Sequence, residues 1–281
     1  MTRRILIVLL LSLAAVTPLA GCGAEDVASD VTSEDVARAA EATIDAGGAR
    51  LDLNGTTNVH GKATIDLEGK GVMDARGNAE IDFDFSGAGE KGSLHQVIAG
   101  ETIYMSSSLF EDLPDGKEWI KVDLAKVTDD LGLENVPQTS GSDPRESLRN
   151  LRAVGDVEKV ATDDVRGVST TRYKATVELR RLPQLVEPAE RATARRSVQR
   201  LIRLLGKDTQ QTEVWVDGKD LVRRTRDEVT VSAPGNQKVT TTMILEYYDF
   251  GARVRVEVPA DREVEDVSRV AAREARKQQR D

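Results

Sequence analysis

Residues 80–85 read Glu80-Ile81-Asp82-Phe83-Asp84-Phe85 and alternate strictly between acidic and apolar side chains. A period of two places successive side chains on opposite faces of a β-strand, so one face is predicted to be buried and the other solvated. This pattern is typical of an antiparallel sheet with one covered face. Because Phe83 lies between two aspartates, its ring is predicted to point toward the core.

On both sides of this segment, further short stretches with strand-like patterns are separated by turn residues such as those at 58–61, 75–78 and 87–92. The other predicted strands are 51–54, 64–68, 94–99, 102–106, 119–122, 157–162, 168–179, 212–216, 221–231, 239–248 and 253–258.

Three parts of the chain are predicted to be helical. One helix begins at Ser33 and ends before two glycines at 47–48, and residues 123–152 hold short helices. The main helix, 188–205, has Val198, Leu201 and Leu205 on one face and arginines on the other. Many strands, with helices packed on one face of the sheet, define an α+β fold. We expect a single domain over 33–260 and a charged, Arg-rich tail over 261–281 that is either helical or frayed.

The N-terminus reads as an export signal. An apolar run over residues 5–16 follows two arginines, and twelve helical residues span only about 18 Å, too short for a membrane core of roughly 30 Å. The run is followed by Leu19-Ala20-Gly21-Cys22. This stretch resembles the bacterial lipobox, which implies a signal peptide over 1–21, cleavage before Cys22, and diacylglyceryl and acyl groups on that residue. The alternative is a buried cysteine with no such role.

The lipid would hold the protein at the extracytoplasmic face of the cell membrane, since two or three acyl chains anchor stably. Residues 22–32 are then the lipidated cysteine and a small, acidic, flexible tether. The formal net charge of −9 disfavours binding to nucleic acid. With one cysteine in 281 residues, no intramolecular disulfide is available.

Residues that would carry catalysis are not evident. His60 and His95 are the only histidines, and neither has the neighbours that a metal site needs. No nucleophile elbow, phosphate loop or dinucleotide fingerprint occurs in the sequence. We therefore expect neither an enzyme nor a metal site, and no cofactor apart from the covalent acyl groups on Cys22.

Five segments, in this order, together resemble a known family: TIYM at 102–105, GKEWIKVD at 116–123, VRGVSTTRY at 165–173, VWVDG at 214–218 and LVRR at 221–224. After a lipobox, they resemble the actinobacterial lipoproteins of the LppX/LprG type, relatives of the LolA lipoprotein carrier. The resemblance implies a LolA-like half-barrel, a large curved antiparallel sheet with helices on its concave face. It also implies an apolar cavity for acyl chains and no catalytic residues.

Inward-facing side chains are the candidates for the cavity wall, and the alternative is that they simply fill a core. They are Ile65, Leu67, Ile81, Phe83, Phe85, Tyr104, Val198, Leu201 and Leu205. Gly69 and Gly71 either leave room beside one strand or permit the sheet to coil. We expect a monomer that binds or transfers a lipid or glycolipid. The alternative function is a non-catalytic sensory or protein-interaction module of the envelope.

Overall fold

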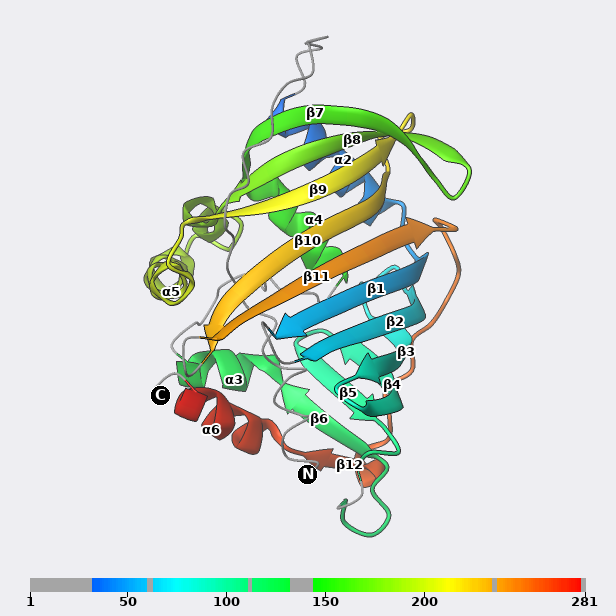
Figure 1. Ribbon diagram of the computed structural model, residues 1–281, viewed down its shortest axis with the longest axis vertical. Coiled ribbons are helices and arrows are strands. Elements are labelled where there is room, and N and C mark those ends of the chain that lie inside the picture. Colours follow the sequence, from blue (N-terminus) through cyan, green and yellow to red (C-terminus); the bar gives the residue numbers. More distant parts are fainter. Residues whose placement is uncertain (1–31, 60–62, 111–112, 132–143, 234–236, 279–281) are drawn as a thin grey trace.

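The computed structural model describes residues 32–59, 63–110, 113–131, 144–233 and 237–278. The predicted signal peptide, Cys22 and all of the predicted tether but Thr32 lie outside these residues. The strands form one curved sheet in the order β12-β6-β5-β4-β3-β2-β1-β11-β10-β9-β8-β7 (Figure 1). Their bounds are β1 Ala49–Val59, β2 Ala63–Met73, β3 Ala79–Gly87, β4 Glu90–Ala99, β5 Thr102–Ser106, β6 Trp119–Asp123, β7 Val154–Val165, β8 Val168–Glu178, β9 Thr209–Asp217, β10 Val222–Ala233, β11 Gln237–Tyr248 and β12 Val264–Asp266.

Neighbouring strands run antiparallel except β12, which pairs parallel with β6. The predicted fold class, a large antiparallel sheet with helices on one face, is confirmed. The helical elements are α2 Ser33–Asp45, α3 Leu124–Leu131, α4 Pro144–Asn150, η1 Leu151–Ala153, η2 Leu179–Gln184, α5 Arg191–Leu205, η3 Asp261–Glu263 and α6 Ser268–Gln278.

Strand β3 shows why the sequence folds this way. Ile81 and Phe83 are buried, whereas Asp82 and Asp84 are exposed, as the alternation predicts. Because β3 pairs with both β2 and β4, its apolar side chains continue onto both neighbours. The buried face of the sheet, called the inner face below, is the one that the helices cover.

Helices α2 and α4 lie behind strands β7 to β11 in Figure 1. Helix α2 is capped by Thr32, one residue before the predicted cap, and Asp35 completes a reciprocal capping box. The helix buries Val36 and Ala40 beneath the sheet. The Thr43 hydroxyl accepts a 2.8 Å hydrogen bond from the backbone N–H of Val222, which attaches the helix to β10.

Helix α5 begins at Arg191, three residues after the predicted start, and ends at Leu205, as predicted. Gly206 follows it with a φ of 69°, which suits a glycine. The helix packs mainly on η2 and lies beyond the ends of β8 and β9 (Figure 1). Val198 and Leu201 are buried, as predicted, and Leu205 is half-buried.

The C-terminal residues differ most from prediction. The strand predicted at 253–258 is absent. Val256 is buried between more exposed neighbours, as in a strand, but this segment pairs with none of the described strands. Residues 264–278 instead form β12 and α6. The backbone N–H of Asp123 donates a 2.9 Å hydrogen bond to the Ser268 hydroxyl, and α6 packs on α3. This segment, predicted as a charged tail, therefore docks on the sheet and the helix layer.

Candidate functional site

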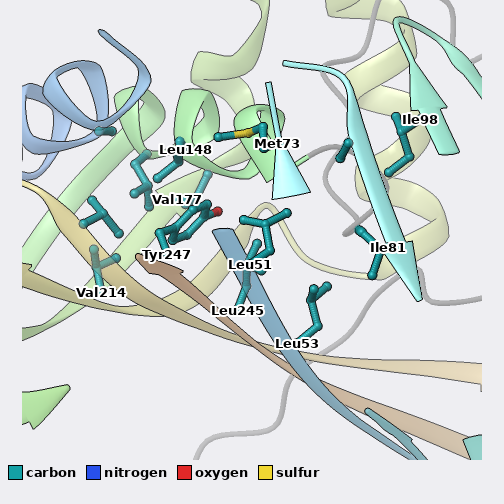
Figure 2. Packing of buried hydrophobic residues seen from close by; sticks show 14 of the residues in the cluster. Leu51, Leu53, Met73, Ile81, Ile98, Leu148, Val177, Val214, Leu245 and Tyr247 are labelled. Carbon is teal, nitrogen blue, oxygen red and sulfur yellow. The ribbon is translucent and has the colours of Figure 1, made fainter. Parts of the chain in front are cut away.

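The inner face of the sheet has two zones that differ in burial. The packed zone lies at one end of strands β11, β1, β2 and β3, beneath α4 (Figure 2). Tyr247 pairs with Leu51 there, and both are at most 1% exposed. The Tyr247 hydroxyl donates a 3.0 Å hydrogen bond to the carbonyl of Pro144, so its polar end is satisfied. The other sheet residues of this zone are Leu53, Met73, Ile81, Phe83 and Leu245.

The open zone lies at the other end of the same strands and on the same face. Ile65, Leu67, Phe85 and Met243 are half-buried there, although each continues the row of side chains that begins in the packed zone. The register aligns Met243 with Gly55, Gly55 with Leu67, and Leu67 with Phe85. Four adjacent strands thus present one continuous apolar strip that the helices cover incompletely.

Glycines shape both zones. A Cβ added at Gly69 would lie 2.6 Å from the ring atom Cδ1 of Phe83, and one at Gly71 would lie 2.3 Å from the carbonyl oxygen of Glu80. The space left by these two glycines is therefore filled from β3. In the open zone, a Cβ at Gly55 would lie 3.1 Å from Cε of Met243, so the flexible thioether side chain closes over this glycine.

One charged residue, Asp227 of β10, lies on the inner face beside the open zone. It pairs with Met243 on β11 and with Thr212 on β9. Burial raises the pKa of the Asp227 carboxyl to about 6, and a hydrogen bond from Thr212 opposes the shift in part. The residue nevertheless keeps some accessible surface.

The outer face of the sheet is polar and carries ion pairs. Arg166 bonds to Asp52 and, at 2.6 Å, to Glu246, and its guanidinium lies 4.1 Å from the centre of the Tyr248 ring. These contacts hold the pKa of Arg166 above its usual value despite partial burial. A depression of about 510 Å³ lies at the edge of this face. It is lined by polar outer-face side chains such as Asp66 and Glu68 and also by Phe85 of the open zone.

Tyr104 is on the outer face, not the inner one. Its neighbours Ile103 and Met105 are the buried residues of β5, and Tyr104 pairs with Lys121. His95 lies on the same outer face, where its Nδ1 is 2.5 Å from Asp82 Oδ1 and its ring packs edge-on against Trp119.

The other residues predicted to line the cavity lie in three places, which are the packed zone, the open zone and helix α5. Ile81 and Phe83 are in the packed zone, and Ile65, Leu67 and Phe85 are in the open zone. The α5 candidates Val198, Leu201 and Leu205 are beside η2 rather than opposite β3.

Two residues of the site were not predicted from the sequence, Met243 and Asp227. Met243 precedes Ile244 and Leu245, so the apolar run does not reveal which side chains face inward. Asp227 follows Arg226 and precedes Glu228, where nothing in the sequence marks one charge as internal.

Two features concern only the described part of the chain. No group of three or more His, Cys, Asp or Glu residues within it is placed to hold a metal ion; His60 lies outside it. None of its helices is both long and apolar enough to cross a membrane.

No protein-family model matches this chain. It is 32% identical over 149 residues to an uncharacterized 31.2 kDa protein of Streptomyces griseus, encoded in the rplA–rplJ intergenic region. That match covers 52% of this chain and 47% of the Streptomyces protein, so the chain spans about half the length of this curated relative.

Solved structures similar to this one include lipoproteins of mycobacteria. Lipoprotein LppX of Mycobacterium tuberculosis is 15% identical, with 80% of this chain and 99% of that chain covered and a TM-score of 0.45. LprF of Mycobacterium bovis is 11% identical, with 81% and 96% covered and a TM-score of 0.42. A LolA superfamily protein of Nitrosomonas europaea is 7% identical, with 82% and 96% covered and a TM-score of 0.30. These are the kinds of protein that the sequence motifs resemble.

Proposed function

We propose that this chain is an envelope lipoprotein that binds an acyl chain of a lipid or lipidated ligand in the open zone. The observation that carries the proposal is the unequal burial along one face of four strands. Leu51 and Ile81 are fully buried at one end, whereas Leu67 and Met243 keep accessible surface at the other. An apolar surface that remains accessible inside a curved sheet is suited to an apolar ligand.

The apolar strip can contribute to the free energy of binding by removing methylene groups of an acyl chain from water. Each methylene group that leaves water contributes about 0.8 kcal/mol, so roughly ten buried methylenes give a gross ~8 kcal/mol. This gross gain corresponds to a Kd of about 1 μM. Ordering the chain and losing its free motion offset part of it, so an affinity in the micromolar range requires that more than about ten methylenes are buried. Met243 packs against the edge of the core but keeps accessible surface, and its flexible thioether side chain can adjust to an acyl chain.

A lipid on Cys22 would keep the domain at the extracytoplasmic face of the membrane, where its ligand resides. This part of the proposal is supported by the basic start, the short apolar run and the lipobox-like residues 19–22. A fatty-acid label should enter the wild-type protein and not the Cys22→Ala variant, and cell fractionation should find that variant unprocessed or released. Equal labelling of both proteins would refute the anchor.

The binding site is tested by a charge placed in the open zone. Leu67→Glu should lower the affinity for a fluorescent acyl probe by about tenfold or more, because the carboxylate loses hydration when the chain binds. Thr64→Glu is the matched control, since it adds the same charge to the same strand at an exposed position. Circular dichroism and urea unfolding verify that both variants fold. Equal probe binding by all three proteins would place the site elsewhere.

The packed zone supports a second candidate, a non-catalytic sensory or protein-interaction module. Tyr247 and Leu51 are buried near α4, and Ile81 is buried farther along the same face, so these side chains leave little accessible surface for a ligand there. If the side chains of the open zone close in the same way in solution, wild type will not bind the probe. That result would favour this second function.

A further inference from the structure

Asp227 is the charged group that a ligand in the open zone would meet, near the hydroxyls of Thr57 and Thr241, which lie 3.0 Å apart on the same face. Strand β10 turns it inward because its neighbours Arg226 and Glu228 point to the outer face, where Arg226 lies 3.0 Å from Glu228 and 3.7 Å from Glu213. Carboxylates are seldom buried without a partner, because the charged form loses its hydration. A carboxylate that faces inward beside an apolar strip is therefore a candidate for a functional role.

The residues around Asp227 do little to compensate its carboxylate for the hydration lost on burial. On the two strands packed against β10, the facing residues are Thr212 and Met243, and neither carries a charge. Arg226 is the charged residue that acts on the carboxyl, and it does so from the opposite face. The Thr212 hydroxyl is shared, since it also contacts the carbonyl of Arg226 at 3.4 Å. The carboxyl oxygens thus keep capacity to accept hydrogen bonds from a molecule bound in the open zone.

We propose that Asp227 is the specificity-determining residue of the open zone, and that it selects an amphiphile whose polar end donates hydrogen bonds. The ligand class is an acyl or alkyl chain that ends in hydroxyl groups or an amine, as in a monoacylglycerol, and not in an anion. The inference rests on the proposed function, since it assigns the head group of the ligand whose chain occupies the strip.

The chemistry follows from charge and hydrogen bonding. A hydroxyl or ammonium group donates to the carboxylate and replaces the water that burial removed. A fatty-acid carboxylate or a phosphate would instead bring a like charge next to Asp227 in surroundings that screen it weakly. Discrimination should shrink as Asp227 takes up a proton. Since burial raises its pKa to about 6, that loss should occur between about pH 7 and pH 5.

The experiment uses unlipidated protein and displacement of the acyl probe by a monoacylglycerol and a fatty acid of equal chain length. At about pH 8, wild type should bind the monoacylglycerol at least about tenfold more tightly than the fatty acid. In Asp227→Asn, which retains the shape and a hydrogen-bonding group, this preference should fall to less than about threefold. Asp84→Asn, at an exposed position on the outer face, should keep the wild-type preference.

The outcomes separate the two proposals. If wild type binds both ligands equally, or if Asp227→Asn keeps the full preference, Asp227 does not select the head group, although an acyl chain still binds. If neither ligand nor the probe binds to wild type, the proposed function itself fails. A preference for the fatty acid in wild type would overturn the assignment of the ligand class.

Discussion

Phe83→Ala is expected to lower the free energy of unfolding by about 3–5 kcal/mol, the range for removing a phenylalanine ring from a dense core. Phe83 is only 7% exposed, and its ring lies over Gly69, which has no side chain of its own to fill the space. The surrounding backbone of β2 and β3 cannot close a void of this size, because the two strands remain fixed by their ladder. Urea unfolding followed by circular dichroism measures the loss.

Phe85→Ala is the matched control, since Phe85 is on the same strand and face, two residues away. It is half-buried in the open zone, so its replacement should cost clearly less than that of Phe83, about 1–2 kcal/mol. Equal large losses in both variants would mean that the open zone is a filled core. Equal small losses would mean that the packed zone is not packed.

Asp227→Asn is expected to stabilise the protein by roughly 3 kcal/mol at about pH 8. The folded-state pKa of about 6 exceeds the ordinary value of 3.8, and each unit of difference corresponds to about 1.4 kcal/mol. Because the pKa is raised by folding, the native state binds the proton more tightly than the unfolded state does. The loss of stability caused by ionised Asp227 is therefore absent below about pH 4. It grows as the pH rises to about 6, where it levels off.

The measurement is the difference in unfolding free energy between wild type and variant across this pH range. Taking the difference removes the contributions of the other carboxylates, including Asp217, whose pKa is lowered by bonds from Arg223 and backbone N–H groups despite its burial. Asp84→Asn should change stability by less than about 0.5 kcal/mol at either end of the range. A gain from Asp227→Asn that does not vary with pH would show that the carboxyl is well solvated.

The buried face of a strand was predicted correctly where polar residues alternate with apolar ones in the sequence. In β3, aspartates separate the apolar residues, so only one face could be buried, and the structure confirms it. In β5, Ile103, Tyr104 and Met105 are all large and largely apolar. The pattern therefore does not indicate which of them face inward, and the prediction for Tyr104 is wrong. The face of a strand is thus predictable only when polar residues interrupt its apolar ones.

The positions of helices and strands in the sequence were easier to predict than the elements that they pack against or pair with. The amphipathic pattern of α5 correctly indicated that Val198 and Leu201 are buried, but it cannot specify the surface that covers them, which is mainly η2. Likewise, the alternation around Val256 indicated an extended chain, but pairing depends on a free strand edge in space. Asp227 was missed because the charges on both of its sides conceal which one points inward.

The central claim, that the open zone holds a lipid, is tested most directly by native mass spectrometry of protein that begins after Cys22. Without the lipid anchor, any lipid mass that accompanies the folded protein must be bound rather than attached. We expect a fraction of the protein to carry one amphiphile from the host, and the Leu67→Glu variant to carry much less. Wild-type protein that is folded, free of lipid and unable to take up added monoacylglycerol would contradict the account.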